Sequence, residues 1–195
     1  MHTRYPYGPE EGAVSVRHGL LALLAESPSY GYQLWTRLET RTGGTWPLNI
    51  GQVYTTLSRL ERDGLVEATE ADGQATYRIT AAGRAAVADW FAGPVARPAP
   101  ARDELAIKLA LAVGSPAVDV RRVVQAQRSA TRHGLQELTR LRAGAGDDAD
   151  LAWRLVLDAL VFQAEAELRW LDHCETRLAT RPAGVPAGER EAASR

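Results

Sequence analysis

Three short helical patterns followed by one hairpin signal constrain the fold of this chain more than any other feature of its sequence. Aliphatic side chains recur at helical spacing before a Ser27-Pro28-Ser29 break, which predicts a first helix. Beyond the break, large apolar side chains follow at three-residue spacing up to Gly43-Gly44, which predicts a second, shorter helix. Two short helices, each closed by helix-breaking residues, indicate a small helical domain early in the chain.

A third helix is predicted from Ile50 to Asp63, and it carries the clearest start signal in the chain. Asn49 is a preferred N-cap residue, and Gln52 lies three positions later, where its side chain can bond back to the Asn49 amide in a capping box. Gly64 follows the last helical residue and is a usual C-terminal stop. Both ends of this helix are thus predicted from local chemistry.

The two faces of this third helix differ in character. At about 100° per residue the aliphatic side chains fall within one sector, and these are Ile50, Val53, Leu57 and Leu60. The opposite side is small, neutral and basic, and it holds Gly51, Gln52, Thr55, Ser58, Arg59 and Arg62, with Tyr54 on the flank. A merely solvated face would carry more glutamate and lysine, so this composition favours contact with DNA.

A β-hairpin is predicted directly after the third helix. Residues 65–69 and 76–80 are β-prone runs joined through Asp72-Gly73, a dipeptide that tolerates the positive φ angles of tight hairpin turns. Thr80 then caps a fourth helix over residues 81–91. Three helices followed by a hairpin indicate a winged helix-turn-helix.

Three runs in this region resemble the PadR-like family of transcriptional regulators. They read LLALLAESPSYGYQLWTRLE from Leu20, WPLNIGQVYTTLSRLERDGLVE from Trp46 and YRITAAGRAAVADW from Tyr77, in the family's order and spacing. The resemblance implies a homodimeric repressor that binds a near-palindromic operator in double-stranded DNA, with the third helix in the major groove. It also implies release by a small molecule or another signal, and the helical remainder has about the length found in longer-tailed members.

The hairpin departs from the family pattern. PadR-like wings are commonly rich in arginine and lysine, whereas this wing carries three acidic residues and a single basic one, Arg78. Gln74, Thr76 and Arg78 are predicted to touch phosphate or the minor groove, but a hairpin that only braces the fold explains them equally well. Two arginines outside the hairpin are candidates to supply the missing charge, namely Arg17 and Arg37.

The predicted DNA-contacting residues come from the third helix and the hairpin: Asn49, Gln52, Tyr54, Thr55, Ser58, Arg59, Arg62, Gln74, Thr76 and Arg78. Gln52 is expected to pair with adenine, and Arg59 with guanine or phosphate. Thr55 is expected to touch a thymine methyl group, and Tyr54 to contact a phosphate while it also packs. Direct base readout is therefore expected from one helix.

The second half of the chain is predicted to form the dimer interface. Residues 103–180 read as helix almost throughout, with Ser115-Pro116 as the expected start of a long helix. Apolar residues recur at three- and four-residue spacing along two long helices, which predicts helix-on-helix packing. Between Leu151 and Phe162 they extend almost all the way round, so a second chain is expected to bury what a helical hairpin leaves exposed.

A small aromatic or hydrophobic effector is a further expectation. Trp90, Trp153, Phe162 and Trp170 are expected near the dimer axis, and tryptophan rings can serve as flat walls for aromatic ligands. The alternative is that these rings are ordinary core, which is the commoner role of tryptophan on an apolar stripe. The resemblance favours an effector, because members of the PadR-like family respond to phenolic acids or hydrophobic drugs.

The predicted fold class is mainly α with a small β-hairpin, a winged helix-turn-helix plus a C-terminal helical dimerisation domain. The expected segments are a flexible N-terminus, a DNA-binding domain, a linker, a dimerisation and effector domain and a disordered tail, at residues 1–13, 14–92, 93–102, 103–180 and 181–195. No stretch approaches the roughly 20 apolar residues of a membrane span, and the N-terminus lacks the apolar run of a signal peptide. A cytoplasmic location without membrane contact is therefore expected.

Chemistry other than DNA binding finds little support in the sequence. The lone Cys174 excludes an internal disulfide and a multi-cysteine zinc site. The sequence also shows no catalytic grouping and no phosphate-binding loop. We therefore expect no enzymatic activity, no cofactor and no metal. The net charge of −1 requires that positive charge for DNA be local. A winged helix used as a protein-interaction module without specific DNA binding stays the alternative.

Overall fold

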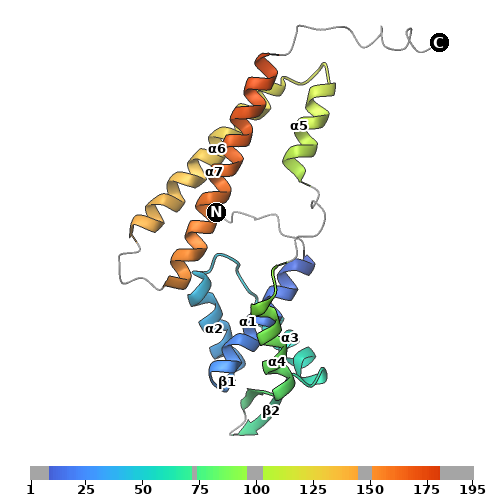
Figure 1. Ribbon diagram of the computed structural model, residues 1–195, viewed down its shortest axis with the longest axis vertical. Helices are drawn as coiled ribbons and strands as arrows, with labels where there is room; N and C mark the ends of the chain where they lie inside the picture. The colour runs from blue at the N-terminus through green and yellow to red at the C-terminus, as the bar shows by residue number, and fades with distance from the viewer. Residues whose placement is uncertain (1–8, 72–73, 96–102, 145–150, 181–195) are drawn as a thin grey trace, which may run out of the picture. The chain divides into compact units, whose positions relative to one another are not determined.

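The computed structural model describes residues 9–71, 74–95, 103–144 and 151–180, and its secondary structure is mainly helical with one small sheet, as predicted (Figure 1). The elements in chain order are α1 (Pro9–Glu26), β1 (Ser29–Tyr30), α2 (Gly31–Thr42), α3 (Ile50–Arg62), β2 (Val66–Ala71), β3 (Gln74–Ile79), α4 (Ala81–Ala92), α5 (Glu104–Gly114), α6 (Val120–Gly144) and α7 (Leu151–Ala179). They form two compact units: Met1–Arg97 with Asp150–Trp153, and Pro98–Ala149 with Arg154–Arg195.

The first unit is built around one aliphatic core to which α1, α2 and α3 all contribute. Its side chains that are less than 2% exposed are Leu20, Leu21, Leu24, Leu34, Val53, Leu57 and Leu60. Tyr77 and Ile79 of β3 and Val87 of α4 complete the same core. The apolar face predicted for the third helix is therefore the buried face, which directs the opposite face of α3 to solvent.

The sheet of the first unit has three antiparallel strands in the order β1-β3-β2, one more than predicted. The additional strand is only two residues long, and it places Tyr30 opposite Thr76. Two residues are too few to show the alternation of apolar and polar side chains by which a strand is predicted from sequence. The strand β1 forms because it pairs with β3, more than forty positions away in the sequence. The predicted turn at Asp72-Gly73 lies outside the described residues.

The ends of the first-unit helices follow the local signals closely, with one exception. The C-cap of α2 is Gly43 in the left-handed region (φ 59°), and Gly64 after α3 has φ 71°. Thr80 caps α4, since its Oγ1 accepts a hydrogen bond from the Gly83 amide at 3.1 Å. The exception is α1, which begins at Pro9 inside the segment expected to be flexible; proline suits the first turn of a helix.

The second unit consists of α5, α6 and α7, which pack around Leu109, Val124 and Leu171. The prediction that Ser115-Pro116 starts the long helix is wrong. Ser115 is instead the C-cap of α5, and α6 begins at Val120. The preceding Asp119 caps α6, because its carboxylate accepts hydrogen bonds from the amides of Arg121 and Arg122. Asp119 is itself a preferred N-cap type, so two cap signals competed within five residues.

Polar side chains hold α6 and α7 together in the middle of their seam. Gln127 and Thr131 of α6 both donate hydrogen bonds to Glu167 Oε1 of α7. The Arg128 guanidinium, next to Gln127 on α6, forms ion pairs with Asp172 and Glu175 of α7. The seam is thus more polar than its helical spacing suggested. None of the helices in the described part of the chain combines the length and the apolar character that a bilayer crossing needs.

Candidate nucleic-acid interface

The start of α3 is fixed by the capping box that the sequence predicted. The Asn49 side-chain oxygen accepts a hydrogen bond from the Gly51 amide at 2.8 Å, and Gln52 Oε1 accepts from the Asn49 amide at 3.3 Å. These bonds satisfy amides that the first turn of a helix otherwise leaves without a partner. The capping box sets where α3 begins and hence which side chains face outward.

The outward face of α3 holds the predicted DNA-contacting side chains together. Asn49, Gln52, Tyr54, Thr55, Ser58, Arg59 and Arg62 are all exposed. We call this set the α3 face. The small residues Gly51 and Thr55 lie in the N-terminal half of α3, whereas the two arginines lie in its C-terminal half. Close approach at one end and long cationic side chains at the other suit a helix that enters the major groove.

Some polar groups of the α3 face are already engaged within the helix. The Thr55 hydroxyl donates to the Gly51 carbonyl at 2.8 Å, and Gln52 Oε1 is the acceptor in the capping box. A bidentate contact with adenine needs both the oxygen and the nitrogen of a glutamine amide, so Gln52 has to release the cap in order to make one. The sequence pattern identified both roles of Gln52 without showing that they compete.

The two arginines differ in how they are held. Arg62 reaches the carboxylate of the adjacent Asp63 at 3.5 Å, while Arg59 forms no ion pair with any residue that the structure describes. The unneutralised guanidinium on the α3 face is therefore that of Arg59. A free guanidinium at this position can take a guanine edge or a phosphate as its acceptor.

Arg17 and Arg37, proposed from the sequence to supplement the weakly basic wing, have structural partners instead. Arg17 donates to Asp63 at the end of α3 at 2.8 Å, and Arg37 and Arg41 both pair with Glu26. Their hydrogen bonds hold the pKa values of the two carboxyl groups below the usual range, Asp63 through Arg17 and Glu26 through Arg41 first. Both arginines tie α1 to its neighbours rather than standing free for phosphate.

The wing presents one polar face, made by alternate residues of β2 and β3. Glu67 pairs with Arg78 and Thr69 with Thr76 across the antiparallel register, and Gln74 is exposed at the tip. The one arginine of this face thus has a carboxylate as its direct cross-strand neighbour. The wing is close to neutral where a DNA phosphate would approach it, which agrees with the reading of the sequence.

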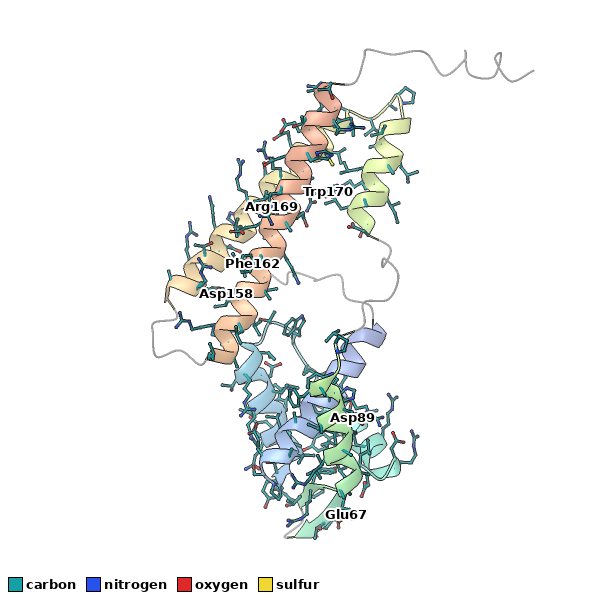
Figure 2. The ribbon with its side chains drawn as sticks, in the orientation of Figure 1. Glu67, Asp89, Asp158, Phe162, Arg169 and Trp170 are labelled. Atoms are coloured by element: carbon teal, nitrogen blue, oxygen red, sulfur yellow. The ribbon has the colours of Figure 1, made fainter. Side chains whose placement is uncertain are left out.

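The four aromatic residues considered for an effector site differ in their surroundings. Trp90 is stacked on His18 within the first unit, with ring centroids 5.2 Å apart. Trp170 packs against the core of the second unit, whereas Phe162 on the same helix is 64% exposed (Figure 2). Trp153 is half-buried. A shallow hollow of about 420 Å³ is lined by Thr139, Arg142, Ala143, Arg154 and Asp158, and thus by none of the four.

A helix-turn-helix with an exposed neutral and basic recognition face, followed by a paired wing, defines a winged-helix DNA-binding regulator. The chain contains a PadR-like family domain, since residues 20–89 match the model described as Transcriptional regulator PadR-like family. Residues 101–179 match a second model, Virulence activator alpha C-term. The resemblance seen in the sequence is confirmed. The second match covers α5, α6 and α7, a region whose likeness to longer-tailed family members had rested only on its helical character and its length.

Two known proteins are similar to this chain along most of its length. The "Probable transcriptional regulator Rv1176c" of Mycobacterium tuberculosis is 28% identical over 179 residues, covering 82% of this chain and 95% of that protein. The virulence activator AphA of Vibrio cholerae has a TM-score of 0.64 at 26% identity, covering 85% of this chain and 98% of that chain.

A third similar structure is PadR of Bacillus subtilis. Its complex with operator DNA has a TM-score of 0.62 at 18% identity, covering 82% of this chain and 95% of that chain. Its complex with p-coumaric acid has a TM-score of 0.67 at 18% identity, covering 84% and 98%. At this level of identity the likeness establishes the shared fold.

Proposed function

We propose that this protein is a homodimeric repressor that binds a near-palindromic operator in double-stranded DNA through the α3 face. The observation that carries the proposal is the α3 face itself: seven exposed polar side chains opposite the buried Val53, Leu57 and Leu60, with Arg59 unpaired among the described residues. Gln52, Arg59 and Thr55 read bases, and Tyr54 contacts a phosphate. The operator complex of Bacillus subtilis PadR supports this use of the fold.

The dimer is proposed to form through α7. Leu151, Leu155 and Phe162 are 67%, 60% and 64% exposed, and helical geometry places them within about 40° of one another on one side of α7. The residues of α7 that are buried within the unit, Leu157 and Leu171 among them, lie on the opposite side. An apolar stripe of this kind on a lone chain is expected to be covered by a partner, and a two-fold axis covers it with itself.

A small hydrophobic or phenolic effector is proposed to release the DNA. The support is the complex of Bacillus subtilis PadR with p-coumaric acid and the exposed Phe162 within the proposed dimer contact. Release requires that the ligand bind the DNA-free arrangement more tightly than the DNA-bound one. Phenolic acids and polycyclic compounds are titrated while tryptophan fluorescence and operator release are followed together, and quenching that leaves the DNA complex intact contradicts the proposal.

The experiment that tests DNA binding is affinity selection of genomic DNA fragments by the purified full chain, followed by sequencing. We expect an enriched palindromic motif, with affinity for it that falls steeply as salt is raised, because phosphate neutralisation releases counterions. Absence of any enriched motif, together with capture of a defined protein partner, would establish the protein-interaction module instead. Raised transcription of the adjacent gene in a deletion strain distinguishes a repressor from an activator.

A further inference from the structure

The ring of Tyr54, on the flank of the α3 face, lies directly against the backbone of Gly31 at the start of α2. A side-chain methyl group at position 31 would meet Cε1 of Tyr54 at 2.5 Å and Cζ at 2.9 Å. Carbon atoms pack at about 3.5 to 4.0 Å, so both separations are far inside contact distance. The tyrosine ring therefore occupies the space that any side chain at this position would need.

Backbone conformation does not explain the glycine. The described glycines with positive φ are Gly43, Gly44 and Gly64, so Gly31 has a conformation that other residues adopt freely. It is the first residue of α2, where alanine has the better helix propensity. The close approach of Tyr54 is thus the structural reason that position 31 carries no side chain.

The surface beneath the ring is anchored on both sides of Gly31. Tyr30, immediately before it, pairs with Thr76 of the wing, and the Tyr30 amide donates to Gln33 Oε1 at 3.1 Å. Gly31 itself is buried, whereas Tyr54 is 45% exposed. A side chain added at position 31 would therefore displace the tyrosine ring toward solvent and leave the backbone where it is.

The position of the Tyr54 hydroxyl follows from this contact. The phenol is held at the junction of α3, the start of α2 and the sheet. Tyr54 is close enough to the sheet to affect Tyr77 of β3. The pKa of Tyr77 is raised first by burial and then by the charges of Glu61 and Tyr54. The ring atoms nearest to position 31 are Cε1 and the hydroxyl-bearing Cζ, so the contact with Gly31 bears directly on where the hydroxyl lies.

We infer that Gly31 is a positioning residue for DNA binding: its bare α-carbon seats the Tyr54 ring and so holds the phenol hydroxyl where it donates to an operator phosphate. The inference rests on the proposed function of the α3 face and goes beyond it, because Gly31 itself is buried and makes no contact with DNA. Position 31 thus requires glycine because of the orientation of a side chain on another helix, that of Tyr54 on α3.

A double-mutant cycle on the full chain tests the inference. Operator affinity at fixed salt is measured by fluorescence anisotropy for Gly31→Ala, Tyr54→Phe and the double variant, with melting temperatures for each. We expect each single variant to lose about tenfold in affinity, the size of one hydrogen bond to a charged group, and the double variant to be no weaker than the worse single one. Gly134→Ala is the matched control, since its added methyl would have nothing within 4 Å.

A second pair of variants separates positioning from instability. In the Tyr54→Ala background the ring is gone, so adding Gly31→Ala should leave the affinity unchanged and should not lower the melting temperature. A full additional loss in that background, additive losses in the cycle, or normal affinity of Gly31→Ala or of Tyr54→Phe would each overturn the inference. A wild-type chain that binds no operator is a different result, because it refutes the proposed function itself.

Discussion

Glu67 on β2 and Arg78 on β3 are direct cross-strand neighbours on the polar face of the wing. Both side chains are exposed, and Glu67 is labelled at the wing in Figure 2. Directly paired residues have Cβ atoms about 5 Å apart, so the carboxylate opposes whatever attraction Arg78 exerts on a phosphate. The wing of this regulator is electrostatically weak because it has a single arginine and that arginine has a glutamate as its cross-strand neighbour.

Replacing Glu67 by glutamine should strengthen DNA binding. We expect an increase of about twofold to fivefold per half-site at low salt, which shrinks as salt is raised because exposed charges are screened. Titrations of operator DNA at several salt concentrations measure it, with Glu137→Gln on α6 as a control of similar exposure. Unchanged affinity at low salt would show that the wing does not approach the DNA.

Arg59→Ala should weaken operator binding by about 1–3 kcal/mol and relax the preference at one base position, as expected for loss of one base or phosphate contact. The Arg59 guanidinium forms no ion pair with another described residue, so its removal should leave the melting temperature nearly unchanged. Competition with mismatched operators reads out the preference. An Arg59→Ala protein with wild-type affinity at fixed salt removes Arg59 from the interface.

Gln52 calls for a different substitution, because its amide oxygen is part of the capping box with Asn49. Gln52→Glu keeps the capping acceptor, since glutamate is the other residue of that motif, but removes the amide donor and adds negative charge. We expect thermal stability close to wild type and operator affinity reduced by about tenfold or more. Gln52→Ala, by contrast, should lower stability as well, and the comparison of the two variants by calorimetry and anisotropy separates the cap from the contact.

Phe162→Arg and Leu155→Arg should each produce monomers, because a guanidinium on the exposed stripe of α7 cannot be buried against its own copy without a partner charge. Sedimentation equilibrium measures the change, and operator affinity should fall with it because only one half-site is held. Tyr32→Arg, another exposed apolar residue, is the control. Deletion of residues 151–195 is a poor substitute, since it removes Leu171 from the core of the second unit. Dimers that persist in both arginine variants place the interface elsewhere.

Acid should weaken the junction of α1 and α2. Arg41 and Arg37 hold the pKa of Glu26 below its ordinary 4.5, so the ion pair stabilises the folded state above that pH and is lost as pH falls through the lowered value. For this exposed pair the contribution is less than about 1 kcal/mol. The free energy of unfolding of Glu26→Gln, measured with denaturant, should be lower than that of the wild type at pH 7, and the difference should disappear as the pH falls through the lowered pKa of Glu26. A constant difference across that range would contradict the assignment.

Most helix ends in this protein are set by residues within four positions of them, and these ends were predictable. Asn49 and Gln52 make the capping box, Thr80 caps α4, and Gly43 closes α2 in the left-handed region. The error at Ser115-Pro116 is of the same local kind, because Asp119 offered a second cap a few residues later. The apolar face of α3 was also predictable, since periodicity alone separates buried from exposed positions.

Interactions between residues that are distant in sequence were settled only by the tertiary structure. The sequence by itself determined the winged helix-turn-helix, the helical second half and the residues of the α3 face. It did not reveal that Arg17 and Arg37 are engaged by Asp63 and Glu26, nor that Tyr54 rests on Gly31. The physical reason is range: caps and faces depend on neighbours a turn away, whereas a charge partner or a seat for a ring depends on how the helices pack.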